Sequence, residues 1–297
     1  MQANNSELKT SLSYLPQIKQ DQILQVVNII KEVANPEKII LFGSHAKGTW
    51  VEDKYFENGT SYEYISDYDF LIVTKRSIEK EYDILDKILN RSRHLFKTPI
   101  NAIIHEIDYI NEGLEIGQYF FTDIMNEGVL LLDNKLVNFA TPRQLSSTEK
   151  RNIAQKYFDK WFSSASNFVK FSQDGFVTLL KENKPLNDAA FLLHQACEKL
   201  YHTVLLVFNG YKPKTHNLDI LRQFSKHLSE ELFSVFPFPT ENEYETHLFD
   251  LLKKGYIDAR YKDDYIINEE EFRTLLGRVI KMKNIVQRIS MARIDSF

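Results

Sequence analysis

Apolar positions in the first 135 or so residues follow two alternating patterns. Over residues 17–34 they recur every three or four positions, which predicts an amphipathic helix ended by Asn35-Pro36. Residues 38–42 form a short unbroken apolar run, which predicts a buried strand. Further strands are expected at residues 67–74, 99–105 and 129–132, and further helices at 77–96, capped by Ser77, and at 109–126. Strands that alternate with helices predict a small α/β unit.

The segment between the first two strands, from Val51 to Tyr64, is polar and aromatic. It contains Asn58-Gly59, a dipeptide typical of a tight turn. We therefore expect an inserted loop or hairpin here.

The pattern changes near residues 138–142, and from Ser147 onward apolar positions keep a helical period. A Ser-Ser-Thr-Glu sequence is the start signal for the first long helix. Later helices are expected at about residues 187–208, 218–228, 243–255 and 269–291. Five helices without a convincing strand predict a helical bundle. The chain is thus expected to be α+β, with a mixed-sheet α/β domain at residues 1–140 and an all-α domain at residues 141–297.

Composition narrows the class of protein. A length of 297 residues suits about two domains. A net charge of −4 gives no overall basic field, so bulk nucleic-acid binding is not indicated, although a local basic groove stays open. The single cysteine, Cys197, fits a reducing compartment. Because the N-terminus lacks an apolar signal core and no run is long enough to span a membrane, we expect a cytoplasmic protein without membrane contact.

Two short motifs carry the candidate chemistry of the first domain. Gly43-Ser44 follows the first strand, and a glycine there lets the backbone approach a phosphate closely. Asp67 and Asp69 stand at period-2 spacing in the second strand, so both carboxylates are expected on one face. Mg²⁺ binds through few carboxylates together with substrate phosphate. The two motifs together predict a metal-dependent phosphoryl-transfer site.

This combination, Gly43-Ser-His-Ala-Lys-Gly followed by Ser66-Asp-Tyr-Asp-Phe-Leu-Ile-Val, resembles the small nucleotidyltransferases of the DNA-polymerase-β-like superfamily over residues 15–135. The resemblance implies that Gly43 and Ser44 hold the phosphates of an NTP. It also implies that Asp67 and Asp69 are catalytic and bind Mg²⁺. We also assign Lys47, in the same motif, to nucleotide binding.

The sequence departs from that family at two places. Twenty-two residues separate Ser44 from Asp67, which is longer than usual and places the 51–64 insertion beside the site. The family also has a third acidic residue on the next strand, and Asn101 stands at the matching position. An asparagine is neither a general base nor a source of charge for a second metal. Glu106 would replace it only if the strand bulges.

The helical half resembles a HEPN domain, a family related to the C-terminal domain of kanamycin nucleotidyltransferase, over residues 147–290. Three blocks carry the likeness: residues 187–201, 210–218 and 258–265. Some HEPN proteins are ribonucleases that use an arginine and a histidine four to six residues later. Arg260 has no such histidine, and Arg222 with His227 fits the spacing on the wrong helix.

Other polar residues of the helical half have simpler interpretations. His194 lies on a mostly apolar helix face, which favours a satisfied core histidine. His216 is expected to cap or orient the next helix. Arg260 and Tyr261 are candidates for contact with a nucleotide phosphate or base.

The leading hypothesis is a Mg²⁺-dependent nucleotidyltransferase that moves a nucleoside monophosphate from an NTP, for which ATP is the first choice, to an acceptor. Asp67, Asp69 and Asn101 are its catalytic candidates. The acceptor is a small molecule, a protein hydroxyl or an RNA end, and a homodimer is expected. The alternative is a nucleotide-binding or toxin-neutralising regulator without turnover, suggested by Asn101, and less so a HEPN ribonuclease.

Overall fold

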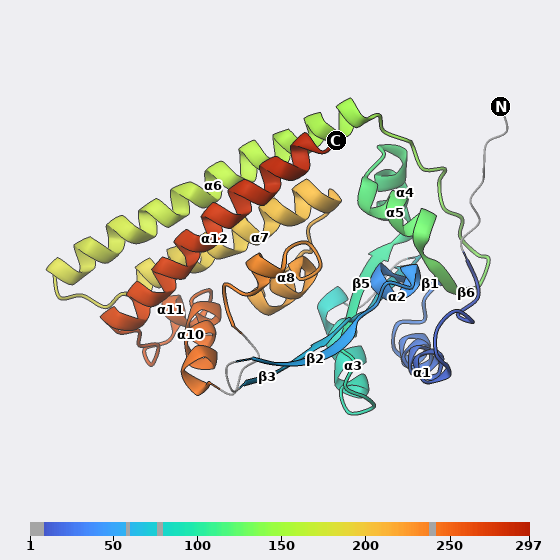
Figure 1. The fold of residues 1–297 in the computed structure, drawn as a ribbon, viewed down its shortest axis with the longest axis horizontal. Helices are drawn as coiled ribbons and strands as arrows, with labels where there is room; N and C mark the ends of the chain where they lie inside the picture. Colours follow the sequence, from blue (N-terminus) through green and yellow to red (C-terminus); the bar gives the residue numbers. More distant parts are fainter. Residues whose placement is uncertain (1–8, 58–59, 76–79, 238–241) are drawn as a thin grey trace. The chain divides into compact units, whose positions relative to one another are not determined.

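The structure, a computed structural model, describes residues 9–57, 60–75, 80–237 and 242–297, with the side chains of 53–64 excepted. The predicted cap Ser77 and the predicted turn Asn58-Gly59 lie outside the described residues. The chain divides into two compact units, residues 1–144 and residues 145–297, and each is described by itself (Figure 1).

A four-stranded mixed sheet, as expected, forms the centre of the N-terminal unit. Its strand order is β5-β4-β1-β6, in which β1 is antiparallel to both neighbours and β4 is parallel to β5. The strands are β1 (Lys38–Phe42), β4 (Tyr68–Thr74), β5 (Ile100–Glu106) and β6 (Val129–Asp133). Every residue of β4 is buried, which explains its unbroken apolar run after Asp69.

In the described residues of this unit, the helices that flank the sheet are α1 (Gln17–Ala34), α2 (Gly43–Lys47), α3 (Glu81–Ser92), α4 (Ile107–Glu115) and α5 (Tyr119–Glu127). The bounds of α1 are as predicted, because Asn35 adopts a left-handed conformation (φ 42°) and donates its N–H to the Lys31 carbonyl. The single helix predicted for residues 109–126 is wrong. It is two helices, separated at Gly117, whose φ of 75° is incompatible with a continuous helix.

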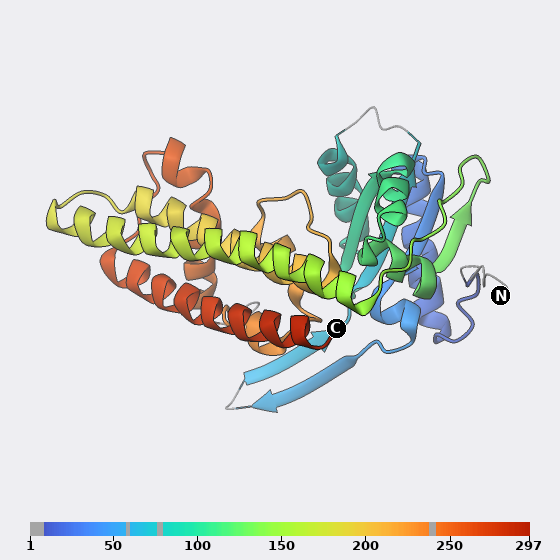
Figure 2. The same cartoon turned by 90° about the horizontal axis from the view of Figure 1, so that it is seen from above.

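The expected insertion is an antiparallel hairpin of β2 (Glu52–Glu57) and β3 (Thr60–Ile65), which form their own two-stranded sheet (Figure 2). Two hydrogen bonds close its base: the Ser66 N–H donates to the Val51 carbonyl, and the Val51 N–H donates to Ser66 Oγ, both at 2.9 Å. Asp67 therefore follows directly after the closed base of the hairpin.

The C-terminal unit is a helical bundle. Its helices are α6 (Ser147–Lys181), α7 (Asn187–Asn209), α8 (Leu218–Ser225), α9 (Glu230–Phe233), α10 (Glu243–Lys254), α11 (Asp258–Tyr261) and α12 (Glu269–Asp295). The three long helices α6, α7 and α12 run side by side (Figures 1 and 2), and α7 is buried over most of its length. α6 begins at the predicted Ser-Ser-Thr-Glu sequence. Ser146 and Glu149 form a capping box there, in which the side chain of each accepts the backbone N–H of the other.

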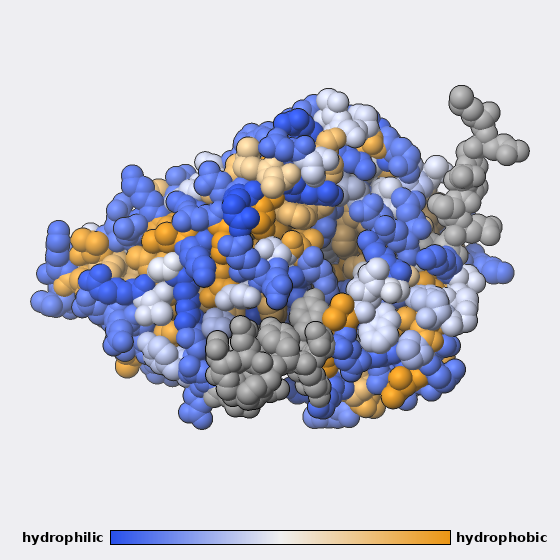
Figure 3. Space-filling view, viewed as in Figure 1, coloured by the Kyte–Doolittle hydropathy of each residue, from blue (hydrophilic) through white to orange (hydrophobic). Residues whose placement is uncertain are grey.

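The helix predicted at residues 218–228 ends earlier, at Ser225, and the short α9 follows it. The face drawn in Figure 3 is mostly hydrophilic with scattered apolar patches. In the described parts of the chain, no helix is both long and apolar enough to cross a lipid bilayer.

Candidate nucleotide site and a histidine–glutamate cluster

Gly43 and Asp69 meet because β1 and β4 pair with Phe42 opposite Asp69. Gly43 has a φ of 73°, a conformation that L side chains rarely adopt. A Cβ at this position would lie 2.1 Å from Asp69 Oδ2. Glycine is therefore required here twice, once for its backbone conformation and once because the carboxylate occupies the space of a side chain.

Asn101 lies beside Asp69, at the position where the family has a third acid. The parallel pairing of β4 and β5 sets Asp69 opposite Asn101, and Asn101 Nδ2 donates to Asp69 Oδ1 at 2.7 Å. The register continues without a bulge to Glu106, which pairs with Thr74 five positions farther on. Glu106 therefore does not substitute for Asn101.

Asp67 immediately precedes β4 and is 2% exposed. Its carbonyl accepts a hydrogen bond from His45 Nδ1 at 2.9 Å. The His45 ring is fully buried, stacks on Trp50 with centroids 5.7 Å apart and lies 4.4 Å from the Tyr68 ring. His45 thus ties the turn after Gly43 to the start of β4, a positioning role that the sequence analysis missed although the motif contained it.

The other two residues predicted from the Gly-Ser motif differ in their surroundings. Ser44 Oγ is buried and has no hydrogen-bond partner among the described residues. Lys47 is about half exposed, and its ammonium pairs with Glu127 of α5 at 2.5 Å. The structure therefore brings together Gly43, Asp69 and Asn101 and links the Asp67 carbonyl to His45 of the same turn, while Lys47 pairs with Glu127.

The donor set can be compared with what Mg²⁺ requires. In the described residues no three His, Cys, Asp or Glu side chains are arranged to hold a metal ion. The two aspartates are both buried, at 2% and 5% exposure, and one of them fills the space that Gly43 leaves. Mg²⁺ commonly uses one or two carboxylates and takes its other ligands from phosphate and water. Asp67 and Asp69 fit an ion that arrives with a nucleotide.

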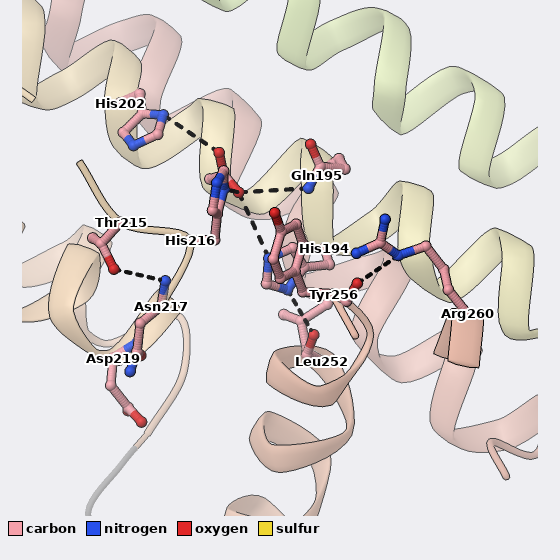
Figure 4. Close-up of polar contacts among 11 residues, drawn as sticks. His194, Gln195, His202, Thr215, His216, Asn217, Asp219, Leu252, Tyr256 and Arg260 are labelled. Carbon is pink, nitrogen blue, oxygen red and sulfur yellow. Dashed lines mark hydrogen bonds and ion pairs between the residues drawn. The ribbon is translucent and has the colours of Figure 1, made fainter. Parts of the chain in front are cut away.

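A second polar cluster surrounds the carboxylate of Glu198, in the middle of α7 (Figure 4). His216 Nδ1 donates to its Oε2 at 2.9 Å, and Gln195 Nε2 does so at 3.5 Å. His194 Nε2 and His202 Nδ1, one turn to either side on α7, lie 3.7 and 3.8 Å from its oxygens. Burial raises the pKa of the Glu198 carboxyl, but His194 and His216 outweigh burial and hold that pKa at about 2.

His194 is a core residue, as expected: it is 1% exposed, and its Nδ1 donates to the Leu252 carbonyl at 3.0 Å. Of the two roles predicted for His216, capping of the next helix is wrong. Asn217 caps α8 by accepting the Asp219 N–H, whereas His216 binds Glu198 and stacks on Tyr256 with centroids 4.5 Å apart.

Comparison with known proteins addresses the helical unit. Residues 150–289 match the family described as HEPN domain. The chain contains a HEPN domain. One curated relative, the Tyrosine-protein kinase SYK of Gallus gallus, is 24% identical over 164 residues, which are 53% of this chain and 23% of that protein. At this identity and coverage the likeness assigns no family and no activity. Because the HEPN match does not reach the N-terminal unit, the nucleotidyltransferase assignment stays a prediction.

The ribonuclease spacing of Arg222 and His227 lies on α8 of the HEPN domain and just beyond it. Arg222 is 1% exposed, and its Nη2 donates to the carbonyls of Phe233 and Phe236 at 3.2 and 2.8 Å. Its guanidinium also lies 3.6 Å from the centroid of the Phe233 ring. Arg222 therefore serves the core of the HEPN domain, which disfavours a ribonuclease role for this pair.

Arg260 and Tyr261, predicted to contact a nucleotide, lie on α11 of the HEPN domain. Arg260 Nε donates to the Tyr256 carbonyl at 2.7 Å, and its guanidinium stacks over Phe191 at 4.6 Å and over Tyr261 at 4.8 Å. Tyr261 is 73% exposed. Both side chains are accessible, and their contact with a nucleotide stays a prediction.

Proposed function

We propose that the N-terminal unit binds a Mg²⁺–nucleoside triphosphate complex, most simply ATP, and transfers the nucleoside monophosphate to an acceptor. The observation that supports this best is the placement of the Asp69 carboxylate in the space that Gly43 leaves, beside the buried Asp67. Such an arrangement sets one carboxylate that would bind Mg²⁺ against a turn whose backbone a phosphate would approach closely, with a second carboxylate two residues earlier in the chain.

The residues would act as follows. Asp67 and Asp69 would hold Mg²⁺, whose charge stabilises the departing pyrophosphate. Gly43, which has no side chain, would let a phosphate oxygen approach the turn closely. Ser44 Oγ, which is buried and has no hydrogen-bond partner among the described residues, would donate to a second phosphate oxygen. His45 maintains the distance between the turn and Asp67 through its hydrogen bond to the Asp67 carbonyl.

One observation favours a second candidate, a regulator that binds the nucleotide without turnover. Asn101 donates its amide N–H to Asp69 Oδ1, so it lends no negative charge and takes no proton from an acceptor hydroxyl. The same geometry that supports nucleotide binding thus weakens the base catalysis that transfer needs.

Calorimetry and pyrophosphate release on the full chain separate the two functions. ATP with Mg²⁺ is expected to bind, and D69N should weaken binding at least tenfold. The matched control E106Q, at the far end of β5 from Asp69, should leave affinity unchanged. Unchanged binding in D69N would disprove the shared site. Pyrophosphate release with a small molecule, protein or RNA acceptor indicates a transferase, and tight binding without release indicates the regulator.

The partners of the chain belong to the same proposal. A homodimer in the cytoplasm, with the HEPN domain contributing to acceptor binding, remains our expectation. Light scattering of the purified full chain gives the oligomeric state directly, and a monomer at micromolar concentration contradicts the dimer.

A further inference from the structure

A buried lysine of α1 joins segments that meet around the two aspartates. Lys19 is 6% exposed, and a lysine is rarely buried to this extent unless its charge is paired. Its ammonium group lies 3.0 Å from Glu52 Oε2, at the base of the hairpin, and donates to Thr98 Oγ1 at 3.3 Å. Thr98 lies two residues before β5. Lys19 therefore links α1 to both the hairpin and the start of β5.

The same ammonium group lies over two aromatic rings. It is 5.3 Å from the centroid of the Trp50 ring and 5.8 Å from that of the Tyr68 ring. A cation is attracted to an aromatic face, and more strongly where water is excluded. The His45 ring contacts both of these rings, and His45 Nδ1 binds the Asp67 carbonyl. Lys19 therefore contacts the two rings that hold His45 against Asp67.

Tyr68 is the residue between the two aspartates. Successive side chains of a strand point to opposite faces, so Tyr68 leaves β4 on the face opposite Asp69. Tyr68 is fully buried, and its hydroxyl donates to Gln22 Oε1 at 2.6 Å, one turn along α1 from Lys19. Its backbone N–H donates to the Pro99 carbonyl at 2.9 Å. Side chains of α1 thus fix the start of β4 through Tyr68.

The chain on the other side of Asp67 is fixed through the hairpin. Glu52 directly follows Val51, which exchanges two hydrogen bonds with Ser66. Ser66 is the residue before Asp67. The ion pair of Lys19 therefore acts on the chain just before Asp67, and its contact with the tyrosine ring acts just after it.

We infer that Lys19 is a positioning residue for the two aspartates: its ammonium group fixes the hairpin base and the Tyr68 ring, and these fix the chain on both sides of Asp67. Loss of the charge leaves both rings without their cation and Glu52 without its partner, so this segment should open more readily. The effect of Lys19 on nucleotide affinity rests on the proposed function of the N-terminal unit, whereas its effect on the backbone around Asp67 does not.

Lys38 offers a matched control within the same unit. It is 5% exposed, its ammonium pairs with Asp133 at 2.5 Å, and it lies 5.4 Å from the centroid of the Phe139 ring. It stands at the opposite end of β1 from Gly43. K19M and K38M each remove one buried charge and keep an unbranched side chain, so both should lower the melting temperature of the N-terminal unit.

Amide hydrogen exchange of the full chain without nucleotide, followed by NMR, tests the backbone around Asp67. K19M should speed exchange of the Ser66 and Tyr68 N–H groups at least tenfold relative to the Asn134 N–H, which directly follows the partner of Lys38. K38M should show the reverse pattern. Equal acceleration of all three N–H groups in both variants would show that Lys19 stabilises the unit without positioning the aspartates, and would overturn the inference.

Calorimetry with Mg²⁺–ATP, well below the melting temperature of each variant, tests the consequence for the site. K19M should bind at least fivefold more weakly than the unsubstituted chain, K38M should bind equally well, and K19R, which keeps a cation, should bind better than K19M. Equal affinity of K19M and the unsubstituted chain would overturn the role at the site. If the unsubstituted chain itself does not bind Mg²⁺–ATP, the proposed function fails, and the exchange pattern alone decides whether Lys19 positions the aspartates.

Discussion

Substitution of Gly43 by alanine tests the geometry of the N-terminal site most directly. The added Cβ would lie 2.1 Å from Asp69 Oδ2, so the carboxylate must move. The same backbone position has a φ of 73°, which strains any residue that has a side chain. The clash acts on Asp69, which we propose as a Mg²⁺ ligand, and the strain acts on the backbone of the turn beside it.

Gly48, at the end of the same short helix, is the matched control. Its φ is 76°, but a Cβ there would lie 3.7 Å from Tyr14, an ordinary contact. G48A should therefore lower the free energy of unfolding by the backbone strain alone, about 1 kcal/mol. G43A should add the loss of the hydrogen bond from Asn101 to the displaced Asp69, about 2 kcal/mol, for a total of about 3 kcal/mol.

Urea unfolding followed by Trp50 fluorescence in a W161F background measures both changes in the N-terminal unit alone. Trp50 stacks on His45 beside the site, so its emission reports this region. Mg²⁺–ATP calorimetry on the same variants should show at least tenfold weaker binding in G43A and near-normal binding in G48A. Equal destabilisation by the two substitutions would refute the placement of Asp69 against Gly43.

Three further predictions follow from other contacts. N101D should destabilise the N-terminal unit in EDTA by about 2 kcal/mol, because a carboxylate replaces the donor to Asp69, and Mg²⁺ should restore melting temperature and raise pyrophosphate release. Burial, together with Lys212, lowers the pKa of His202 to about 4. The contribution of neutral His202 to the free energy of unfolding is therefore complete above pH 6.5 and falls by about 3 kcal/mol as the pH drops to 4. H202L should flatten this pH dependence in unfolding monitored by Trp161 fluorescence. R222M should lower the stability of the HEPN domain by about 2 kcal/mol, read from denaturant midpoints, because two buried carbonyls lose their donor; an unchanged midpoint would show that they find another.

Local patterns in the sequence predicted most of the elements because each such pattern is decided by a few neighbouring residues. The apolar period and Asn35-Pro36 predicted the bounds of α1, and the Ser-Ser-Thr-Glu signal predicted the start of α6. Errors arose where one residue interrupts a periodic run, as Gly117 does between α4 and α5. Periodicity averages over a window and does not register a single left-handed residue.

In the N-terminal site, too, local sequence predicted the residues but not how they are arranged. Asp67, Asp69 and Asn101 were named from motif and resemblance, but their relation depends on strand register. Only the parallel pairing of β4 with β5 placed Asn101 opposite Asp69 and Glu106 five positions away. A register shift of one residue turns each side chain to the other face, so spacing within one strand does not decide it.

The sequence by itself determined that an α/β unit precedes a helical bundle, that the bundle resembles a HEPN domain and that two aspartates follow a Gly-Ser turn. Only the tertiary structure decided that Asp69 occupies the space left by Gly43, and that Glu198 gathers His194, His202 and His216. The first class of feature depends on residues close in the chain. The second depends on which surfaces of distant elements are buried together, and that is decided by packing of the whole unit.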